Sequence, residues 1–476
     1  MAQRSTEVND VVAAGVARQA AMVARGEVSS VELTRTVLAR VEGAQRALGA
    51  FRVVLAERAL RDASDADHRR AAGARPPLLG VPVAVKDDTD VAGEATPFGA
   101  GGRWPRAEHD AEVVRRLRRA GAVIVGKTTT SEFGQWPTGD SVAFGVTRNP
   151  WDPSRTPGGS SAGAAVAVAA GLVAGALGSD GAGSVRIPAA WTGLVGVKPQ
   201  RGRISGWPDP DPFHGITCIG PLARTVDDVA LLLDAVAGNH PGDRARPSPP
   251  PAPFRTLAAE VPGRLRIGLS FAVPPLIEAT VDAEIRAAVE QLAGILDGLG
   301  HDVVPVGIDY GLVGLSFLPR GTAGSAEWAA RRERPVLERA TRVDARVGRL
   351  LGRWPLRLAR AAEARIAARI GRVFERCDVV LTPTTAQHPL PVGALEGLGW
   401  WHSGKVVSGA CPFCWVWNTL GWPALSVPAG RSRAGWPIGA QLLGRPEDEV
   451  TLLRLAGQLE EAEGWPAAWP PGWPCP

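Results

Sequence analysis

The chain has 476 residues, of which 45% are hydrophobic and 21% charged, ordinary values for a globular protein with a sizeable core. A formal net charge of +5 is small for this length, and no nucleic-acid motif or aromatic interleaving accompanies the basic residues. Residues 1–28 lack the apolar core of a signal peptide, and the most apolar run, 164–177, is too short to cross a bilayer. We therefore expect a cytoplasmic protein without nucleic-acid or membrane partners.

Apolar patterns predict helices and strands that alternate along the chain. The first helical region covers residues 8–45 and contains a capping box, Ser29 and Glu32, ahead of an apolar periodicity. This alternation favours an α/β protein with a largely interior sheet. Further elements follow in chain order: a strand at 78–85, a helix at 110–120, a strand at 122–125, a helix of small residues at about 161–171, a strand at 265–269, a helix at 282–299, an Arg-rich helical region at 311–375 and a strand at 379–381.

Two glycine-rich segments flank the helix of small residues. The first reads Gly-Gly-Ser-Ser-Ala-Gly at 158–163, and the second reads Asp-Gly-Ala-Gly-Ser-Val-Arg at 180–186. Residues 181–183 can present a run of free backbone N–H groups beside Ser184. Such a cluster of N–H groups suits the negative charge that develops on a carbonyl oxygen during acyl transfer.

A nucleophilic serine needs a base to accept its proton. The chain has seven histidines, but none stands in a recognisable triad motif, and no G-x-S-x-G pattern occurs. Lys86 is the alternative base, because the apolar run 81–85 would carry it into the interior. Burial disfavours an ammonium ion and lowers the lysine pKa, which makes a neutral amine available.

Together these segments resemble the amidase signature family. The glycine-rich segments and the helix between them correspond to the signature itself, and residues 80–87 correspond to the strand that carries the family's lysine. The agreement is weakest at 245–375. Further matching segments lie at 126–133, 149–152, 193–199, 220–226, 423–428 and 439–444.

The resemblance implies one α/β domain over residues 1–476, with a central mixed, twisted sheet flanked by helices on both sides. Its core would comprise residues 65–240 and 376–465, and a variable helical cap at about 245–375 would face the substrate. The family needs no metal and no cofactor. The sequence does not decide between a monomer and a homodimer.

The resemblance also implies a Ser–Ser–Lys triad that forms an acyl-enzyme. Ser184 would be the nucleophile, Ser160 the bridging serine after a cis peptide bond, and Lys86 the neutral base. The oxyanion hole would consist of the N–H groups of Gly181, Ala182, Gly183 and Ser184. Ser161, Asp180 and Arg186 would support these loops, and Gly134 and Gln135 would face the substrate.

Two positions depart from the usual family pattern. Ala162 replaces the first of two glycines after the paired serines, and Ala182 lies in a Gly-Ala-Gly-Ser sequence where the family has Thr-Gly-Gly-Ser. Alanine keeps the backbone N–H but has a narrower φ range than glycine. The oxyanion hole can therefore form only if φ of Ala182 is below zero.

Three functions remain open from the sequence. The first is a stand-alone amidase that cleaves small carboxamides, anilides, esters or carbamates. The second is the glutaminase component of an aminoacyl-tRNA amidotransferase complex, which typically has Gln after the signature arginine, where this chain has Ile187. The third is a non-catalytic binding protein, against which the presence of all three triad residues argues.

Other motifs have simpler interpretations. Residues 121–128 fit the P-loop pattern, but their apolar middle is typical of a strand and not of a phosphate-binding loop. Cys411 and Cys414 have C-x-x-C spacing without a redox or zinc context, so we expect ordinary thiols. The tryptophans at 400, 401, 415, 417 and 422 could serve either the core or an aromatic substrate pocket.

Overall fold

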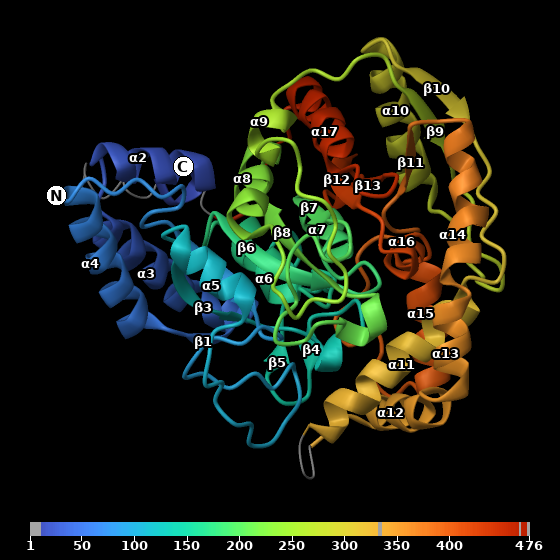
Figure 1. The fold of residues 1–476 in the computed structure, drawn as a ribbon, viewed down its shortest axis with the longest axis horizontal. Coiled ribbons are helices and arrows are strands. Elements are labelled where there is room, and N and C mark those ends of the chain that lie inside the picture. The colour runs from blue at the N-terminus through green and yellow to red at the C-terminus, as the bar shows by residue number, and fades with distance from the viewer. Residues whose placement is uncertain (1–10, 332–335, 466–467, 474–476) are drawn as a thin grey trace.

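A computed structural model of the protein describes residues 11–331, 336–465 and 468–473 (Figure 1). Its centre is a mixed sheet of 11 strands, which confirms the predicted α/β class. β2 is parallel to both of its neighbours, whereas the middle of the sheet from β6 to β11 is antiparallel. The order across the sheet is β1 (Phe51–Val54), β3 (Val123–Thr128), β2 (Pro82–Lys86), β6 (Gly175–Asp180), β8 (Cys218–Ala223), β7 (Val195–Lys198), β12 (Ala424–Arg431), β13 (Pro437–Leu443), β11 (Val379–Pro383), β9 (Arg266–Leu269) and β10 (Asp302–Pro305).

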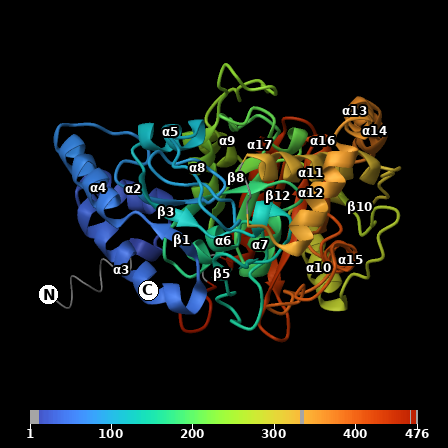
Figure 2. The ribbon, with the colours of Figure 1, turned by 90° about the horizontal axis from the view of Figure 1, so that it is seen from below.

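Helices cover both faces of the sheet (Figures 1 and 2). Alternate residues of β2 enter two different apolar clusters: Val83 and Val85 join one, and Ala84 joins the other. This alternation is the period-2 pattern of a strand that is buried on both faces. The first cluster contains α5 (Glu112–Arg119), α8 (Val226–Val236), α10 (Ala283–Gly298) and α17 (Glu449–Glu463), and the second contains α3 (Ser30–Leu48) and α6 (Ala162–Ala169).

Most of the predicted elements are present, with shifted ends. The capping box of Ser29 and Glu32 begins α3, and a turn separates α3 from α2 (Val16–Arg25). β2 begins at Pro82 and not at residue 78, because Gly80 adopts φ +77° in the preceding turn. The first residues of the predicted 8–45 region lie outside the described part of the chain.

The α6 helix is buried along its whole length, and small side chains make this possible. A Cβ atom on Gly163 would lie 2.2 Å from the carbonyl oxygen of Ala50, closer than non-bonded atoms approach. Only glycine lets the helix approach β1 and β3 this closely. The close approach fixes the start of α6, where Ser160 and Ser161 lie.

Residues 245–375 divide into two parts. The first part supplies β9, α10 and β10, which extend the central sheet. The second part forms helices that pack together at the lower right of Figure 1, beside α15 (Trp400–Ala410) and α16 (Trp415–Leu420). In the described ranges, no helix is both long and apolar enough to span a bilayer. The helices of the second part are α11 (Gly314–Ala330), α12 (Arg339–Leu351), α13 (Trp354–Ala361) and α14 (Glu363–Gly371).

Candidate active site

Lys86 is the last residue of β2 and is 1% exposed. Its Nζ atom lies 2.7 Å from Oγ of Ser160, which stands just before α6. The peptide bond between Gly159 and Ser160 is cis. The structure therefore brings together Lys86 and Ser160, which are 74 positions apart in the sequence.

Two groups that the sequence analysis missed complete the surroundings of Lys86. Oγ of Ser179, at the end of the adjacent β6, lies 2.8 Å from Nζ, and Oδ2 of Asp88 lies 3.5 Å away. Burial lowers the pKa of Lys86, and the charge of Asp88 raises it in part; the net shift is downward. The signal for both residues was adjacency, because Asp88 follows the lysine strand and Ser179 precedes the signature aspartate.

Ser184 lies in the loop between β6 and α7 (Arg186–Thr192) and is 7% exposed. Its carbonyl oxygen accepts a hydrogen bond from the N–H of Ser161 at 3.1 Å, which joins the two glycine-rich segments. Oγ of Ser161 also bonds the backbone of Ser179. Ser160 and Ser184 line the same pocket, so the segments place both hydroxyl-bearing residues at one cavity.

A fully buried ion pair holds the loop of Ser184. Arg186 donates to both carboxylate oxygens of Asp180, at 3.0 and 2.9 Å, and also to Asn418 and Gln441. Burial alone would raise the pKa of Asp180, but the charge and hydrogen bonds of Arg186 hold that pKa well below its usual value. The carboxylate is therefore permanently ionised and pins both ends of the loop.

The backbone N–H groups before Ser184 have two different roles. The N–H of Gly183, which adopts φ +113°, donates to Asp180 at 2.7 Å. The N–H groups of Gly181, Ala182 and Ser184 have no acceptor among the described residues, and all three residues line the pocket. Ala182 is not among the residues with positive φ, so the replacement of glycine leaves this backbone path intact.

The pocket has a volume of about 560 Å³ and mostly apolar walls. The helices of residues 311–351 and α15 supply much of its lining, and several exposed leucines surround its mouth. Aromatic side chains are concentrated there because they offer large apolar contact area. The apolar lining includes Phe98, Phe133, Phe213, Ile187, Ile216, Leu276, Leu312, Leu315, Phe317, Leu318, Trp400, Trp401 and Trp415.

Gly134 and Gln135 both line this pocket, on the loop after β3. Gly134 adopts φ +67°, and a Cβ atom there would lie 3.1 Å from Oγ of Ser160. The amide of Gln135 donates to Ser325 at 2.9 Å and to Asp344 at 3.0 Å. Ser325 and Asp344 were missed by the sequence analysis, because nothing in their local sequence distinguishes them from other helical residues.

The tryptophans serve both of the purposes considered. Trp400, Trp401 and Trp415 line the pocket, whereas Trp417 and Trp422 belong to an apolar cluster of the core.

The motifs set aside in the sequence also have structural explanations. Lys127, in the segment with P-loop spacing, is buried in β3 and pairs with Asp87 at 3.0 Å. Cys411 and Cys414 are free, and burial raises the pKa of both thiols.

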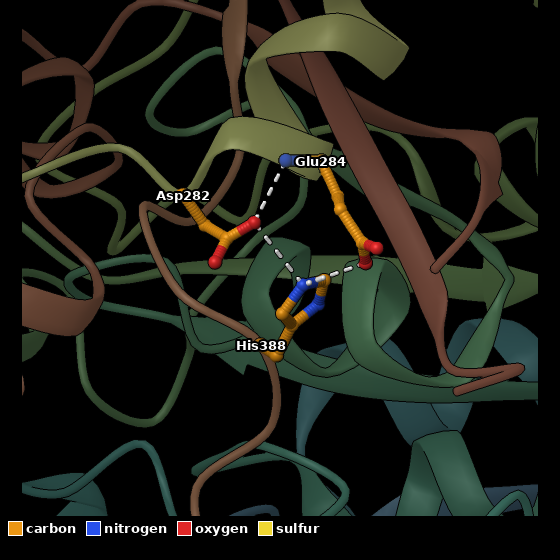
Figure 3. A group of neighbouring side chains, drawn as sticks. All are labelled: Asp282, Glu284 and His388. Carbon is orange, nitrogen blue, oxygen red and sulfur yellow. Dashed lines mark hydrogen bonds and ion pairs between the residues drawn. The ribbon is translucent and has the colours of Figure 1, made fainter. Parts of the chain in front are cut away.

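One group of metal-ligating residue types lies at the start of α10 and after β11 (Figure 3). Nε2 of His388 is 3.3 Å from Asp282 and 3.5 Å from Glu284. Asp282 also accepts the N–H of Glu284 as the N-cap of α10. Capping and ion pairing account for this group, and none of its members lines the pocket.

Comparison with known proteins decides the family, because the Amidase family model matches residues 32–453. The chain belongs to the amidase signature family. The protein named AmiA2 of Mycobacterium tuberculosis is 52% identical over 449 residues, which cover 94% of this chain and 92% of that one. The A-type component of the glutamyl-tRNA(Gln) amidotransferase of Anaeromyxobacter dehalogenans is 36% identical, with coverage of 98% and 99%.

Solved structures agree with this assignment. A 6-aminohexanoate cyclic dimer hydrolase superposes with a TM-score of 0.89 and 32% identity, over 97% of this chain and 99% of the other. Family membership and these relatives make the protein a hydrolase that acts on amides. The apolar pocket next to Lys86, Ser160 and Ser184 is the place in this amidase where such a substrate fits.

Proposed function

We propose that this amidase is a stand-alone hydrolase of small molecules in which an amide, ester or carbamate group carries a bulky apolar substituent. One observation carries the proposal: the buried amine of Lys86 lies 2.7 Å from Oγ of Ser160, at a pocket that Ser184 also lines. A desolvated lysine in contact with a hydroxyl is a suitable general base near neutral pH. We assign the enzyme to the cytoplasm.

In this proposal, neutral Lys86 accepts the proton of Ser160, and Ser160 accepts that of Ser184. Oγ of Ser184 attacks the carbonyl carbon, and a C–O bond forms as the carbonyl π electrons move to oxygen. When the tetrahedral intermediate collapses, the C–N bond breaks and the proton returns from Lys86 through Ser160 to the leaving amine. Water then cleaves the ester on Ser184 by the same proton path.

The negative charge on the tetrahedral intermediate would be bound by backbone N–H groups. Those of Gly181, Ala182 and Ser184 have no other acceptor among the described residues, so they are available without any rearrangement. The N–H of Gly183 instead keeps the loop attached to Asp180. Such preorganised donors reduce the barrier because they need not reorient as the charge forms. Ser161 and the pair of Asp180 and Arg186 would act by holding this loop.

The substrate class follows from the walls of the pocket. Aromatic and aliphatic side chains dominate the lining, and Leu276, Leu312 and Leu315 at the mouth are more than half exposed. An aryl or long alkyl group on either side of the scissile bond would cover this apolar surface, which stabilises binding in proportion to the area removed from water. A carbamate presents the same acyl carbon to Ser184 and fits the same site.

The pocket supports the glutaminase role in an amidotransferase less well. Ile187, which stands where the amidotransferase glutaminase has Gln after the signature arginine, lines the pocket with an apolar side chain. Glutamine carries three polar groups that need hydrogen-bonding partners. The stand-alone amidase is therefore the function that the geometry favours.

The test uses an aryl anilide, an aryl carbamate and glutamine as substrates. We expect wild type to release aniline or alcohol, and Ser184→Ala and Lys86→Ala to lose this activity. Ser64→Ala, on a helix remote from the pocket (α4, Ala56–Ala71), is the matched control and should keep it. Activity on glutamine alone would favour the amidotransferase role, and activity that survives in Ser184→Ala would refute the nucleophile.

A further inference from the structure

The apolar pocket contains one acidic side chain, Asp344 of α12. Asp344 is 8% exposed, and the only other charged residue among the described lining residues is Lys405 of α15. Lys405 is exposed, and no ion pair between described residues joins it to Asp344. A single buried carboxylate in a wall of aromatic and aliphatic side chains needs an explanation, because burial of an ionised group is costly.

The neighbours of Asp344 favour its ionised form. Nε1 of Trp400 donates to Oδ1 at 2.9 Å, and Nε2 of Gln135 donates to Oδ2 at 3.0 Å. Both are N–H groups, which cannot accept a proton from a neutral carboxylic acid. Each carboxylate oxygen therefore acts as an acceptor, and the bonds fix the orientation of the group relative to the pocket.

No cation in the described part of the chain neutralises this carboxylate. Among these residues, no Lys, Arg or His nitrogen lies within 4.0 Å of Asp344, whereas the other buried acids Asp87, Asp180 and Glu449 each pair with one. In addition, Oε1 of Gln135 is buried and has no hydrogen-bond partner. The wall therefore holds a negative charge and a neighbouring acceptor, both without a donor from the protein that would balance them.

These acceptors lie close to the reaction centre. Gln135 follows Gly134, whose missing Cβ would touch Oγ of Ser160 at 3.1 Å. The indole of Trp400 bonds Asp344 and also lines the pocket, so an aromatic ring lies beside the carboxylate. A carboxylate, an amide oxygen and an aromatic ring together form a suitable site for an alkylammonium ion.

We propose that Asp344 binds a primary ammonium group of the substrate, so that the preferred substrates are apolar amides or carbamates that also carry a free amine. This inference rests on the proposed function for the position of the scissile bond. The substrate would supply the positive charge that the pocket lacks. Gln135 Oε1 would accept a second N–H of the same group, and the apolar walls would enclose the carbon chain.

The first experiment measures binding without any catalytic step. Alkylammonium ions of increasing length are titrated calorimetrically into wild type, Asp344→Asn and the control Glu327→Gln, with alcohols of equal length as the uncharged probes. Glu327 lies on the neighbouring α11 with a 60% exposed side chain that pairs with His214, outside the pocket lining. We expect wild type and Glu327→Gln to bind the ammonium about ten- to a hundredfold more tightly than the alcohol, and Asp344→Asn to lose this difference.

The second experiment compares ω-aminoacyl 4-nitroanilides with acyl 4-nitroanilides that end in a methyl group. A preference of wild type for the amine at one chain length, lost through KM in Asp344→Asn with kcat for the methyl substrate unchanged, supports the inference. Equal binding of ammonium and alcohol by wild type, or a preference that persists in Asp344→Asn, overturns it. Failure of the proposed function is separate, because it would appear as no anilide hydrolysis at all or as hydrolysis that survives in Ser184→Ala.

Discussion

The hydroxyl of Ser179 donates a hydrogen bond to Asp88, and the same oxygen lies 2.8 Å from Nζ of Lys86. Asp88 thus acts on the lysine both directly, across 3.5 Å, and through Ser179. Its charge favours the ammonium form and opposes the effect of burial. The balance of these two effects sets the pH at which Lys86 becomes a base.

Asp88→Asn should therefore move the acid limb of the pH profile. Removal of the negative charge lowers the pKa of Lys86, so the neutral amine forms at lower pH, and kcat/KM rises earlier as pH increases. The measurement is kcat/KM for an anilide from acid to alkaline pH. Asp65→Asn, on an exposed side chain, is the control and should leave the limb in place. A limb that stays fixed or moves to higher pH in Asp88→Asn would contradict this role.

Gly134→Ala should impair catalysis more than stability. The added Cβ would lie 3.1 Å from Oγ of Ser160 and 3.0 Å from the ring of Phe98, so the hydroxyl must shift. Displacement of a catalytic group by a fraction of an ångström typically costs about ten- to a hundredfold in rate. We expect that loss in kcat/KM, with KM changed less than kcat.

Gly145→Ala is the matched control for this substitution. Gly145 also has a positive φ, +83°, but its added Cβ would meet no atom within 4 Å. Both variants therefore carry the same kind of backbone strain, which urea unfolding measures, and only one crowds Ser160. Equal losses of activity in the two variants would show that strain and not contact is responsible.

Sequence reasoning succeeded where local pattern and function coincide. The apolar run before Lys86 predicted a buried strand end, and the glycine-rich segments around Ser160 and Ser184 predicted two loops at one site; the contact between Lys86 and Ser160 agrees with both. Residues 265–269 and 282–299 were also predicted correctly as strand and helix. These elements carry strong apolar periodicity, which depends little on distant parts of the chain.

The walls of the pocket could not be predicted in the same way. Asp344 and Ser325 belong to two different helices, and they meet Gln135 from positions about 200 residues away in the sequence. Their contact depends on how α11 and α12 pack, which no local signal encodes. Phe98 and Phe213 likewise reach the pocket from loops in which they adopt positive φ, a conformation that sequence preferences do not predict for phenylalanine.

Arg186→Met should destabilise the fold as well as the site. The side chain is 0% exposed, and its loss leaves Asp180 as a buried charge without its main partner. Removal of one member of a buried pair costs about 3–5 kcal/mol in unfolding free energy. Arg255→Met breaks the half-exposed pair with Asp227 and should cost less than about 1 kcal/mol in urea unfolding. Similar losses in the two variants would mean that the buried pair has no special role.

Glu132 should make stability depend on pH. It lies next to Phe133 and Gly134 of the pocket loop and accepts the N–H of Glu338, at the start of α12, at 2.9 Å. Burial raises its pKa from the ordinary 4.5 to about 7. Between these two values the folded state binds a proton that the unfolded state has released, so stability falls as pH rises from about 4.5 through 7.

Glu132→Gln should remove this part of the pH dependence, because the amide cannot ionise and its oxygen still accepts the N–H of Glu338. Urea unfolding of both proteins at pH 5 and pH 8 measures the effect, and we expect the variant to gain about 1–3 kcal/mol relative to wild type at the higher pH. Burial also raises the pKa of Glu460, to about 7, so wild type and variant will both keep a residual slope. The decisive quantity is the difference between the two slopes. If it is zero, Glu132 is already ionised in the folded protein at pH 5, and the contact between the pocket loop and α12 does not depend on its proton.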